Sequence, residues 1–254
     1  MRVKSRHTAS LAMMFCLVSS YAMAQQPAVD PAPAPPQKAL RGSAGAGLSL
    51  TQGNSETLNL SATVDSIYDP MTGNVMKWSA LYLRGKQNGV LAVNRVSAGF
   101  RDENTLSPRT FVFGQVDSLH DTFKSIDYLF APTAGIGFKA INSMRSQLSM
   151  DIGAGGVVEK DTGADAQGSG AVSLSEKLVH QITATTTLKQ SVTSLLKMNH
   201  VDDGLYTFQV GVAVKISEGL QLSVDVLDTL KSQPLDPATK RNDLAIVTSV
   251  VAKY

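Results

Sequence analysis

Apolar and polar residues alternate along most of this chain from Gly42 onward. Every second residue from Tyr206 to Ile216 is apolar, and the alternation resumes at Leu220 after a link that contains Gly219. A period of two is typical of β-strands, because successive side chains point to opposite faces, and a short glycine-containing link between two such runs indicates an antiparallel hairpin. We predict twelve strands in all, near residues 42–51, 55–66, 76–86, 90–102, 109–122, 126–139, 145–159, 168–180, 182–197, 203–216, 219–231 and 241–253.

The alternation is less regular in the third to fifth of these strands. If Phe111 and Phe113 point to the apolar side, Asp117 points there as well, because all three positions share one parity. A β-bulge or a misplaced strand boundary would account for the irregularity. The sequence leaves both explanations open.

The side chains opposite the apolar ones are mostly Ser, Thr, Gly, Gln and Asn, and charged residues make up only 17% of the chain. A soluble sandwich or a lipocalin-like barrel would hide its apolar side chains and expose a richly charged surface. The pattern instead favours apolar side chains that face lipid around a polar interior. Since strands span hydrocarbon only as a closed barrel, we predict an all-β fold: a closed antiparallel transmembrane β-barrel of about twelve strands over residues 42–254, in contact with outer-membrane lipid.

The first 24 residues have the composition of a cleaved secretory signal peptide. Basic residues at positions 2, 4 and 6 precede an apolar run from Leu11 to Val18, and Ala22-Met23-Ala24 forms a cleavage site. The only cysteine, Cys16, lies within this segment, so a disulfide scaffold is excluded for the rest. We expect export through the inner membrane to the outer membrane of a Gram-negative bacterium. Residues 25–41 then form a proline-rich periplasmic leader, either a spacer or a contact with the cell wall or another periplasmic partner.

Removal of the signal peptide changes the net charge of the chain. Taking its three Lys and Arg residues from the total of 23 leaves 20 basic against 21 acidic residues, which is −1 in place of +2. No basic field remains that would attract nucleic acid, so we expect no nucleic-acid partner.

The aromatic residues fall near the predicted strand ends, as expected for the girdles of a membrane barrel. With a periplasmic N-terminal tail, odd-numbered strands run outward and even-numbered strands return. We predict an interfacial girdle from ten residues: Trp78, Phe100, Phe111, Phe113, Phe123, Tyr128, Phe130, Phe138, Tyr206 and Phe208. The C-terminal Tyr254 is similar to the terminal aromatic that the bacterial barrel-assembly machinery reads as an assembly signal.

Gly53-Asn54-Ser55-Glu56-Thr57 has the sequence of a GN-[ST]-x-T turn, and residues 113–138 have that of a central hairpin that ends in Gly135-Ile136-Gly137-Phe138. Both stretches resemble motifs of a bacterial family of salt-induced outer-membrane proteins, YdiY-like, whose molecular function is unknown. Lys77-Trp78 also fits, whereas Pro132 inside a strand and the proline-rich leader depart from the pattern. The resemblance covers residues 42–254 and implies a barrel, an outer-membrane location and a role under osmotic stress. It implies no catalytic residue.

No combination of residues predicts an enzyme or a metal site. His120, His180 and His200 have no second His or Cys at metal-binding spacing, and no G-x-S-x-G motif is present. Ser118 lies beside His120, but histidines at strand ends and in loops are ordinarily solvated. We therefore predict no catalytic residue, no cofactor and no metal ligand.

Three charged residues lie on the polar side near the middles of the seventh, ninth and eleventh predicted strands: Asp151, Lys189 and Asp225. In a closed barrel they would project into the lumen, where they would either set ion selectivity or pair with one another and plug the interior. The sequence accordingly leaves two functions: a non-enzymatic envelope protein related to osmotic stress, or a narrow passive channel for ions or small solutes.

Overall fold

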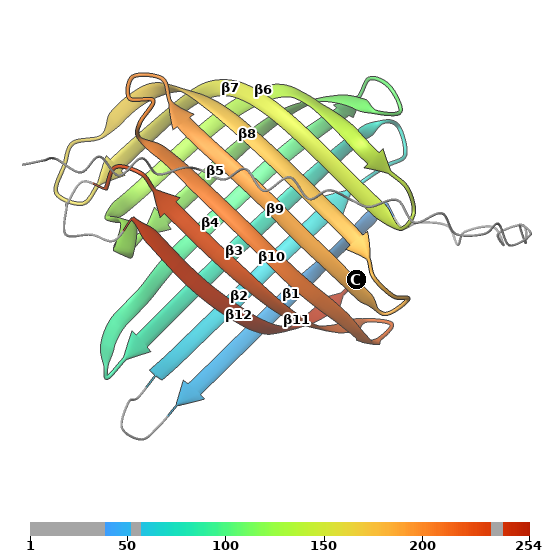
Figure 1. Cartoon of the computed structure of the whole chain (residues 1–254), viewed down its shortest axis with the longest axis horizontal. Coiled ribbons are helices and arrows are strands. Elements are labelled where there is room, and N and C mark those ends of the chain that lie inside the picture. The colour runs from blue at the N-terminus through green and yellow to red at the C-terminus, as the bar shows by residue number, and fades with distance from the viewer. Residues whose placement is uncertain (1–38, 52–56, 235–240) are drawn as a thin grey trace, which may run out of the picture. The chain divides into compact units, whose positions relative to one another are not determined.

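In a computed structural model of the chain, residues 39–51, 57–234 and 241–254 are described (Figure 1). They form a closed antiparallel β-barrel in which each strand pairs with its neighbours in the sequence and β1 pairs with β12. The strands are β1 (Leu40–Thr51), β2 (Thr57–Tyr68), β3 (Asn74–Gln87), β4 (Val90–Thr105), β5 (Thr110–Asp121), β6 (Ile126–Asn142), β7 (Ser146–Asp161), β8 (Gln167–Gln181), β9 (Thr186–Lys197), β10 (Gly204–Ser217), β11 (Leu220–Lys231) and β12 (Asn242–Lys253), and a short 3₁₀ helix, η1 (Thr122–Lys124), follows β5. The predicted fold class is confirmed, with strand ends within a few residues of those expected.

Some of the predictions lie outside the described residues. These are the signal peptide, the leader up to residue 38, and positions 53–56 of the glycine-asparagine turn. The first strand begins at Leu40, two residues before the predicted start of the barrel. None of the described residues forms a helix long and apolar enough to span a membrane.

The ring closes where the first strand meets the last. Residues 43–46 of β1 pair with residues 250–253 of β12 in antiparallel register. Beyond that ladder, Gly42 and Tyr254 exchange two backbone hydrogen bonds of 3.3 and 3.2 Å. The Tyr254 hydroxyl lies 2.6 Å from Oγ of Ser66 on β2, and a side chain at position 42 would collide with the tyrosine ring. Tyr254 therefore fastens the seam of the barrel, and its role as an assembly signal stays a prediction.

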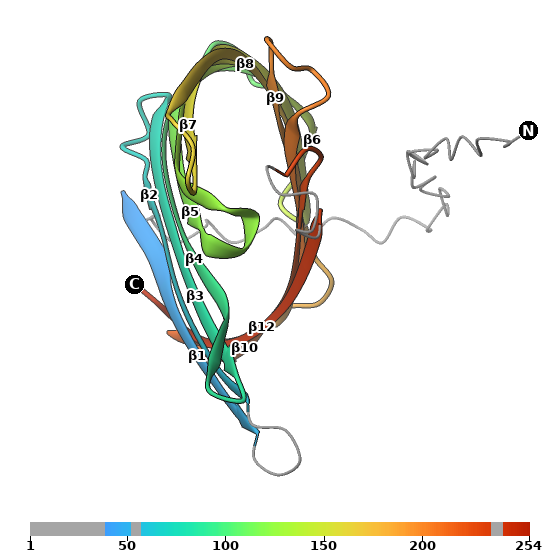
Figure 2. The same cartoon turned by 90° about the vertical axis from the view of Figure 1, so that its left-hand side faces the viewer.

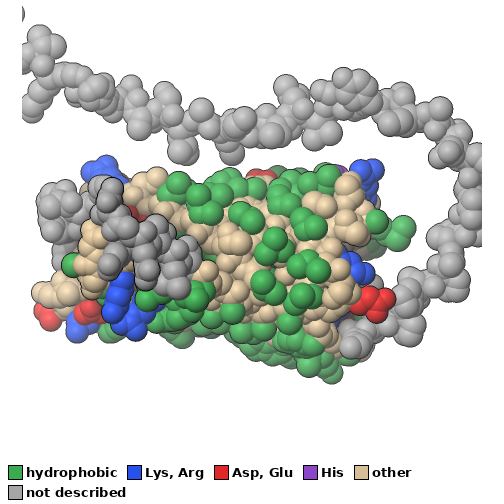
Figure 3. Space-filling model, turned by 90° about the horizontal axis from the view of Figure 1, so that it is seen from below, with side chains coloured by type: hydrophobic (Ala, Val, Ile, Leu, Met, Phe, Trp, Pro, Cys, Tyr) green, Lys and Arg blue, Asp and Glu red, His purple; other side chains and the backbone are tan. Residues whose placement is uncertain are grey.

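The two faces of the strands differ in chemistry. Outward side chains such as Ile136, Ile152 and Ile246 are more than half exposed, and apolar side chains cover most of the surface between the ends in Figure 3. Inward positions include the buried polar residues Ser61 and Ser173. This arrangement suits a ring surrounded by hydrocarbon, because the strands pair with their neighbours around the ring, with a short ladder of four residue pairs at the β1–β12 seam, and present apolar side chains to lipid. The chain is thus a transmembrane barrel, as predicted.

Local irregularities follow from particular residues. Asn88 and Gly89 have positive φ angles of 50° and 78°, as the tight turn between β3 and β4 requires. Pro132 lies in β6 on the outer face, and the ladder to β7 has a gap between Phe130 and Thr133, since proline has no N–H to donate. The strand therefore tolerates the proline that departs from the family pattern.

The structure corrects the predicted positions of Phe111 and Phe113. Both side chains point into the barrel, where they are only 2% and 4% exposed, so they do not belong to a lipid-facing girdle. The pairing of β5 with β4 is continuous through both residues and on to Asp117. Between Phe111 and Asp117, neither a bulge nor a misplaced boundary therefore causes the irregular alternation; two large aromatic residues occupy inward positions there. Register shifts do occur elsewhere in these strands, at Gly85–Lys86 and at Leu119–Asp121.

A charge on the lipid-facing side of a strand should destabilise the barrel far more than the same charge on the neighbouring residue, which faces the lumen. We expect Val224→Arg on the outside of β11 to lower the free energy of unfolding by about 2–4 kcal/mol near the membrane centre. Ser223→Arg faces inward beside Asp225 and should change it by less than about 1 kcal/mol. Guanidinium unfolding in lipid vesicles, followed by the change in gel migration between unheated and boiled samples, measures both. Equal losses would show that the faces are assigned wrongly.

Candidate functional site

The interior of the barrel is the candidate site, and it differs along its length. We call the end at which β1 begins and β12 ends the terminus end, and the opposite end the far end. Inward-facing Asp65, Asp117, Lys177 and Lys189 have exposed side chains, so water reaches them within the ring. We call this water-accessible part of the terminus half the vestibule; on the wall formed by β4, β5 and β7 the same half holds buried side chains, among them Arg101, Phe111 and Asp151. Towards the far end the inward side chains are buried.

Lys189 and Asp225, two of the predicted lumen charges, lie on one wall of the vestibule. Gly211 of β10 pairs with Lys189 on β9 and with Asp225 on β11. The Asp225 carboxylate lies over Gly211, in the space that a side chain there would fill, and accepts a 2.6 Å hydrogen bond from the Ser223 hydroxyl. Asp65 on β2 interacts electrostatically with both charges. The absence of a side chain at Gly211 thus leaves room for the Asp225 carboxylate.

Asp151, the third predicted charge, belongs to a different cluster. Its carboxylate accepts a 2.9 Å hydrogen bond from the Arg101 guanidinium, which also bonds Glu103 at 2.7 Å. The same guanidinium lies 3.7 Å from the ring centroid of Phe113. Asp151 is therefore neutralised by an arginine and not by Lys189. The three predicted residues do not form one ring of charge.

Glycines on the neighbouring strands make room for the two inward phenylalanines. Phe111 pairs directly with Gly137, and Phe113 with Gly135, across the β5–β6 ladder. A Cβ at Gly137 would overlap the Phe111 ring, and one at Gly153 on β7 would lie 3.0 Å from the Phe113 ring. The Gly-x-Gly motif that resembles the YdiY-like family thus serves packing inside the barrel. Large rings opposite small residues fill the interior without strain.

Hydrogen bonds join opposite walls in the far half of the lumen. The Lys231 ammonium on β11 lies 2.6 Å from Glu159 and 2.7 Å from Asp161, both on β7, although three strands separate β7 from β11 in the ring. Arg95 on β4 donates a 2.7 Å hydrogen bond to Thr229 on β11, and four strands lie between them. Lys197 on β9 adds ion pairs with Glu159 and, at 2.6 Å, with Asp203. Such bonds narrow the far half of the lumen.

The connection between β5 and β6 adds a further bridge. It folds inside the ring of strands, as the green segment in Figure 2 shows. The fully buried Lys124 reaches the start of β12, with its ammonium 2.7 Å from the Arg241 carbonyl oxygen and 2.9 Å from the Asp243 carboxylate. This connection therefore lies across the lumen and holds the two walls together.

Apolar side chains fill the space around these bridges. One buried cluster consists of Leu119, Ile126, Leu129, Ala131, Val157 and Ala171, with Leu195 and Leu205 packed against it. A second contains Leu83, Leu227 and Val247. The expectation of a uniformly polar interior is thus wrong for the far half. We call the bridges and both apolar clusters together the lumen seal.

Inward space remains in at least two cavities. One of about 200 Å³ lies within the seal, where Leu83, Arg95 and Thr229 are among its lining residues. The other, of about 250 Å³, lies next to the seal. Ser97, Gln115, Asp117, Lys177 and Thr193 are among its lining residues. Its side chains offer both charges and several hydroxyl groups, which suits water or a small polar solute. No group of three or more His, Cys, Asp or Glu side chains in the described parts of the chain is placed to hold a metal ion.

His120 and His180 make structural contacts on the outer face. His120 Nδ1 lies 2.8 Å from the Asp127 carbonyl oxygen, and His180 Nδ1 lies 2.7 Å from Oγ of Ser146. The Ser118 hydroxyl donates to the Ala98 carbonyl oxygen at 3.3 Å and has no bond to His120. The Ser118–His120 arrangement is therefore not a nucleophile with its base.

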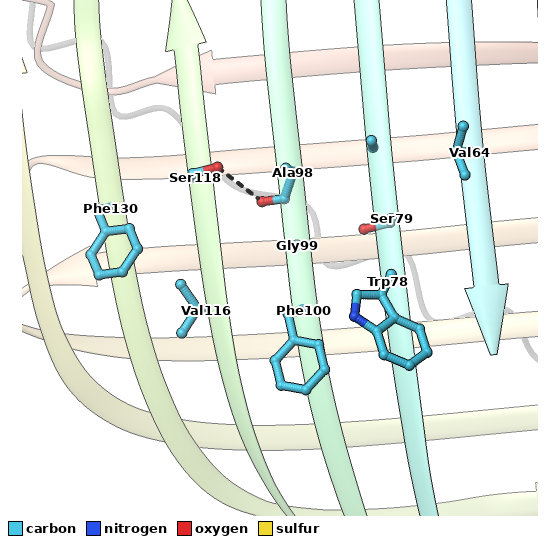
Figure 4. A pocket seen from close by; sticks show the side chains of 10 residues that line it. Val64, Trp78, Ser79, Ala98, Gly99, Phe100, Val116, Ser118 and Phe130 are labelled. Atoms are coloured by element: carbon cyan, nitrogen blue, oxygen red, sulfur yellow. Dashed lines mark hydrogen bonds between the residues drawn. The ribbon is translucent and has the colours of Figure 1, made fainter. Parts of the chain in front are cut away.

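A shallow groove on the outer surface shows how the aromatic residues meet lipid (Figure 4). It has a volume of about 340 Å³ and lies over the small residues Ala80 and Ala98, between Trp78, Phe100 and Phe130. The rings of Trp78 and Phe100 are 5.6 Å apart. The structure places Trp78, Phe100, Tyr128, Phe130, Phe138 and Phe208 on the exterior with 39–46% exposure, and Tyr206 there half-exposed, whereas the Phe123 side chain lies outside the described part. Their position at a membrane interface stays a prediction.

Sequence reasoning missed the residues that close the lumen. Arg95, Glu159 and Lys231 all lie on the inward parity near the far ends of their strands, which was readable from the alternation. Nothing in the sequence showed that they meet across the ring. Lys189 and Asp225 were found because they lie near the centres of the predicted strands, whereas the vestibule residues Asp65, Asp117 and Lys177 were also missed.

One family model and several solved structures are similar to this chain. The chain matches the family model described as "Protein of unknown function, DUF481" over residues 44–254. Among solved structures it is similar to the NanC porin, with 10% identity over 85% of this chain and 97% of that chain and a TM-score of 0.47. It is similar to the KdgM porin in complex with disordered oligogalacturonate, with 6% identity over 84% of this chain and 98% of that chain and a TM-score of 0.46. It is also similar to the translocator domain of the autotransporter NalP from Neisseria meningitidis (11% identity, 86% and 89%, TM-score 0.45). These likenesses carry no argument about function, and no curated protein sequence matches the chain.

The glycine–phenylalanine packing predicts a pair of compensating substitutions. Gly137→Ala should lower the free energy of unfolding by about 1–3 kcal/mol, because the added methyl group overlaps the Phe111 ring. Adding Phe111→Leu should recover at least half of that loss. Gly114→Ala, where no atom lies within 4 Å, is the matched control and should be neutral within about 0.5 kcal/mol. Additive losses in a double-mutant cycle would contradict the contact.

Water access should differ sharply between the two halves of the lumen. In a chain with Cys16 replaced by serine, we expect Lys189→Cys in the vestibule to react quickly with a charged thiol reagent. Ala171→Cys within the seal should react only after unfolding, because Ala171 is fully buried. Mass spectrometry of the labelled protein in nanodiscs measures both rates. Equal rates would contradict the division of the lumen.

Proposed function

Because the chain belongs to the DUF481 family, whose function is unknown, we propose a function from the geometry of the barrel itself. The protein is a non-enzymatic β-barrel of the bacterial outer membrane whose lumen opens at the terminus end and is closed at the far end. In this conformation it conducts no ions. The proposal of a closed far end rests on the hydrogen bonds that join opposite walls of the barrel. The clearest are those from Lys231 to Glu159 and from Arg95 to Thr229.

The outer-membrane location is supported by two independent features. Closed barrels with apolar exteriors are the β-structures that satisfy their backbones in hydrocarbon, and even-stranded antiparallel barrels are the bacterial outer-membrane type. The predicted signal peptide supplies the route across the inner membrane. In that orientation the terminus end faces the periplasm, so the vestibule is filled from the periplasmic side.

We propose no reaction, because the polar side chains near the seal that could act as acids or bases are bonded to other groups of the barrel. The candidate acids and bases near the seal are engaged in ion pairs, as in the Glu159–Lys231 pair, and His120 and His180 bond to the barrel's own backbone or hydroxyl groups. A catalytic residue needs a free face toward a substrate. This supports a structural or transport role, and the role under osmotic stress that the family resemblance implies stays a prediction.

A gated narrow channel is the second candidate. The cavity next to the seal is lined by charged and hydroxyl-bearing side chains, and the seal alone separates it from the far end. Ion pairs of this kind close a passage without a covalent link, so they can separate. A stimulus that separated the Lys231 and Arg95 bridges would join the vestibule to the outside.

Conductance measurements distinguish an always-closed barrel from a gated channel. We expect the wild-type protein to give no stepwise currents in planar bilayers. Glu159→Ala combined with Lys231→Ala removes both partners of one bridge, while Lys197 keeps its ion pair with Asp203. This variant should show brief channel openings, because one bridge across the lumen is lost.

Lys253→Ala at the terminus end is the control, and it should be as silent as the wild type because it leaves the seal intact. Steady wild-type currents would overturn the closed lumen. Silence of the double variant would remove the gated channel and leave a closed envelope protein. A growth comparison of deletion and wild-type strains in high salt tests the stress role separately.

A further inference from the structure

Two polar side chains interrupt the lipid-facing wall of β8 and β9. Glu176 points outward from β8, between Leu174 and Leu178 on its own strand and opposite Met150 and Val192 on the neighbouring strands. Gln190 points outward from β9 and is surrounded in the same way by Leu188, Val192, Leu178 and Val210. A carboxylate and an amide are thus each enclosed by four apolar side chains on a surface that faces hydrocarbon.

Glu176 lies near the middle of the membrane-spanning wall. The register joins Phe138, Met150, Glu176, Val192 and Phe208 in one row across five neighbouring strands, β6 to β10. Because the strands are tilted (Figure 1), this row climbs along the barrel, from Phe138 near the terminus end to Phe208 near the far end. Glu176 is its central member. It cannot reach water simply by extending toward a headgroup, as a residue at the rim does.

Neither side chain has a hydrogen-bond partner within its own chain, as far as the structure describes it. Several other polar residues on the exterior do: Ser118 bonds Ala98, His120 bonds Asp127 and Ser66 bonds Tyr254. Polar groups in lipid are costly unless they are satisfied, and inside membranes they pair with one another. Ser194, the outward residue four positions after Gln190, adds a hydroxyl group on the same surface. We call Glu176, Gln190 and Ser194 the outer polar patch.

We propose that the outer polar patch is the contact surface for a second copy of this chain, and that the protein forms a two-fold dimer in the plane of the membrane. The patch is self-complementary, since Glu176 accepts hydrogen bonds while the Gln190 amide and the Ser194 hydroxyl donate them. A two-fold contact places the same residues opposite one another. Two copies inserted by the same route also share one orientation, so patches at equal depth meet. The inference rests on the membrane-spanning fold and is independent of whether the lumen conducts.

Site-directed cross-linking tests the contact in membranes. In a full-length chain with Cys16 replaced by serine, Val192→Cys lies within the patch and leaves its three polar groups intact. Oxidation should produce a disulfide-linked dimer. Ala62→Cys on β2, an exposed position on the opposite wall of the ring, is the matched control and should stay monomeric.

Removal of the carboxylate should then abolish the contact. Adding Glu176→Leu to Val192→Cys should lower the cross-linked fraction about tenfold or more and shift the mass in nanodiscs from dimer to monomer. Ser118→Leu makes a similar polar-to-apolar change on β5 and should leave the dimer intact. Retention of the shift between unheated and boiled gel migration shows that the variant is still folded.

Three results would overturn the proposal. They are a monomeric wild type in membranes, equal cross-linking at positions 192 and 62, or a dimer that survives Glu176→Leu. A different protein that cross-links to Val192→Cys in stoichiometric amount would also overturn it, because the patch would then serve another partner.

Discussion

The backbone of a strand in hydrocarbon must find all its hydrogen-bond partners within the protein, and the rest of this structure depends on that constraint. It excludes an open sheet, so β1 has to meet β12. The seam is completed by backbone bonds between Gly42 and Tyr254 and by the hydroxyl contact with Ser66. Once the ring is closed, every second residue points inward and every other one outward, whatever its chemistry.

That fixed parity has different consequences in the two halves of the lumen. Near the terminus end, glycines face the inward phenylalanines, and charged groups such as Lys189 remain in contact with water. Near the far end, leucines, valines and ion pairs replace the water. A closed ring of twelve strands is therefore not a pore by default. Its inward side chains decide whether anything passes.

The ion pairs of the seal contribute specificity more than stability. Removing two charges from water costs about as much as their mutual attraction returns, so a buried pair such as Lys231 and Glu159 adds little net free energy of folding. The ion pair does determine which positions on β7 and β11 lie next to each other across the lumen. The same reasoning applies outside, where an unsatisfied carboxylate such as Glu176 disfavours exposure to lipid and favours a contact that pairs it.

The sequence alone determined the number of strands, their approximate bounds and the outward direction of the apolar side chains, because a period of two is a local property that each strand displays by itself. It found Lys189 and Asp225 but placed Asp151 with them, and it assigned Phe111 and Phe113 to the lipid face. Only the tertiary structure decided which inward residues meet. Arg101 and Asp151 are 50 positions apart, Glu159 and Lys231 are 72 apart, and Arg95 and Thr229 are 134 apart. Alternation tells which face a side chain takes, whereas its partner across the lumen depends on register, tilt and ring closure, which no single strand encodes.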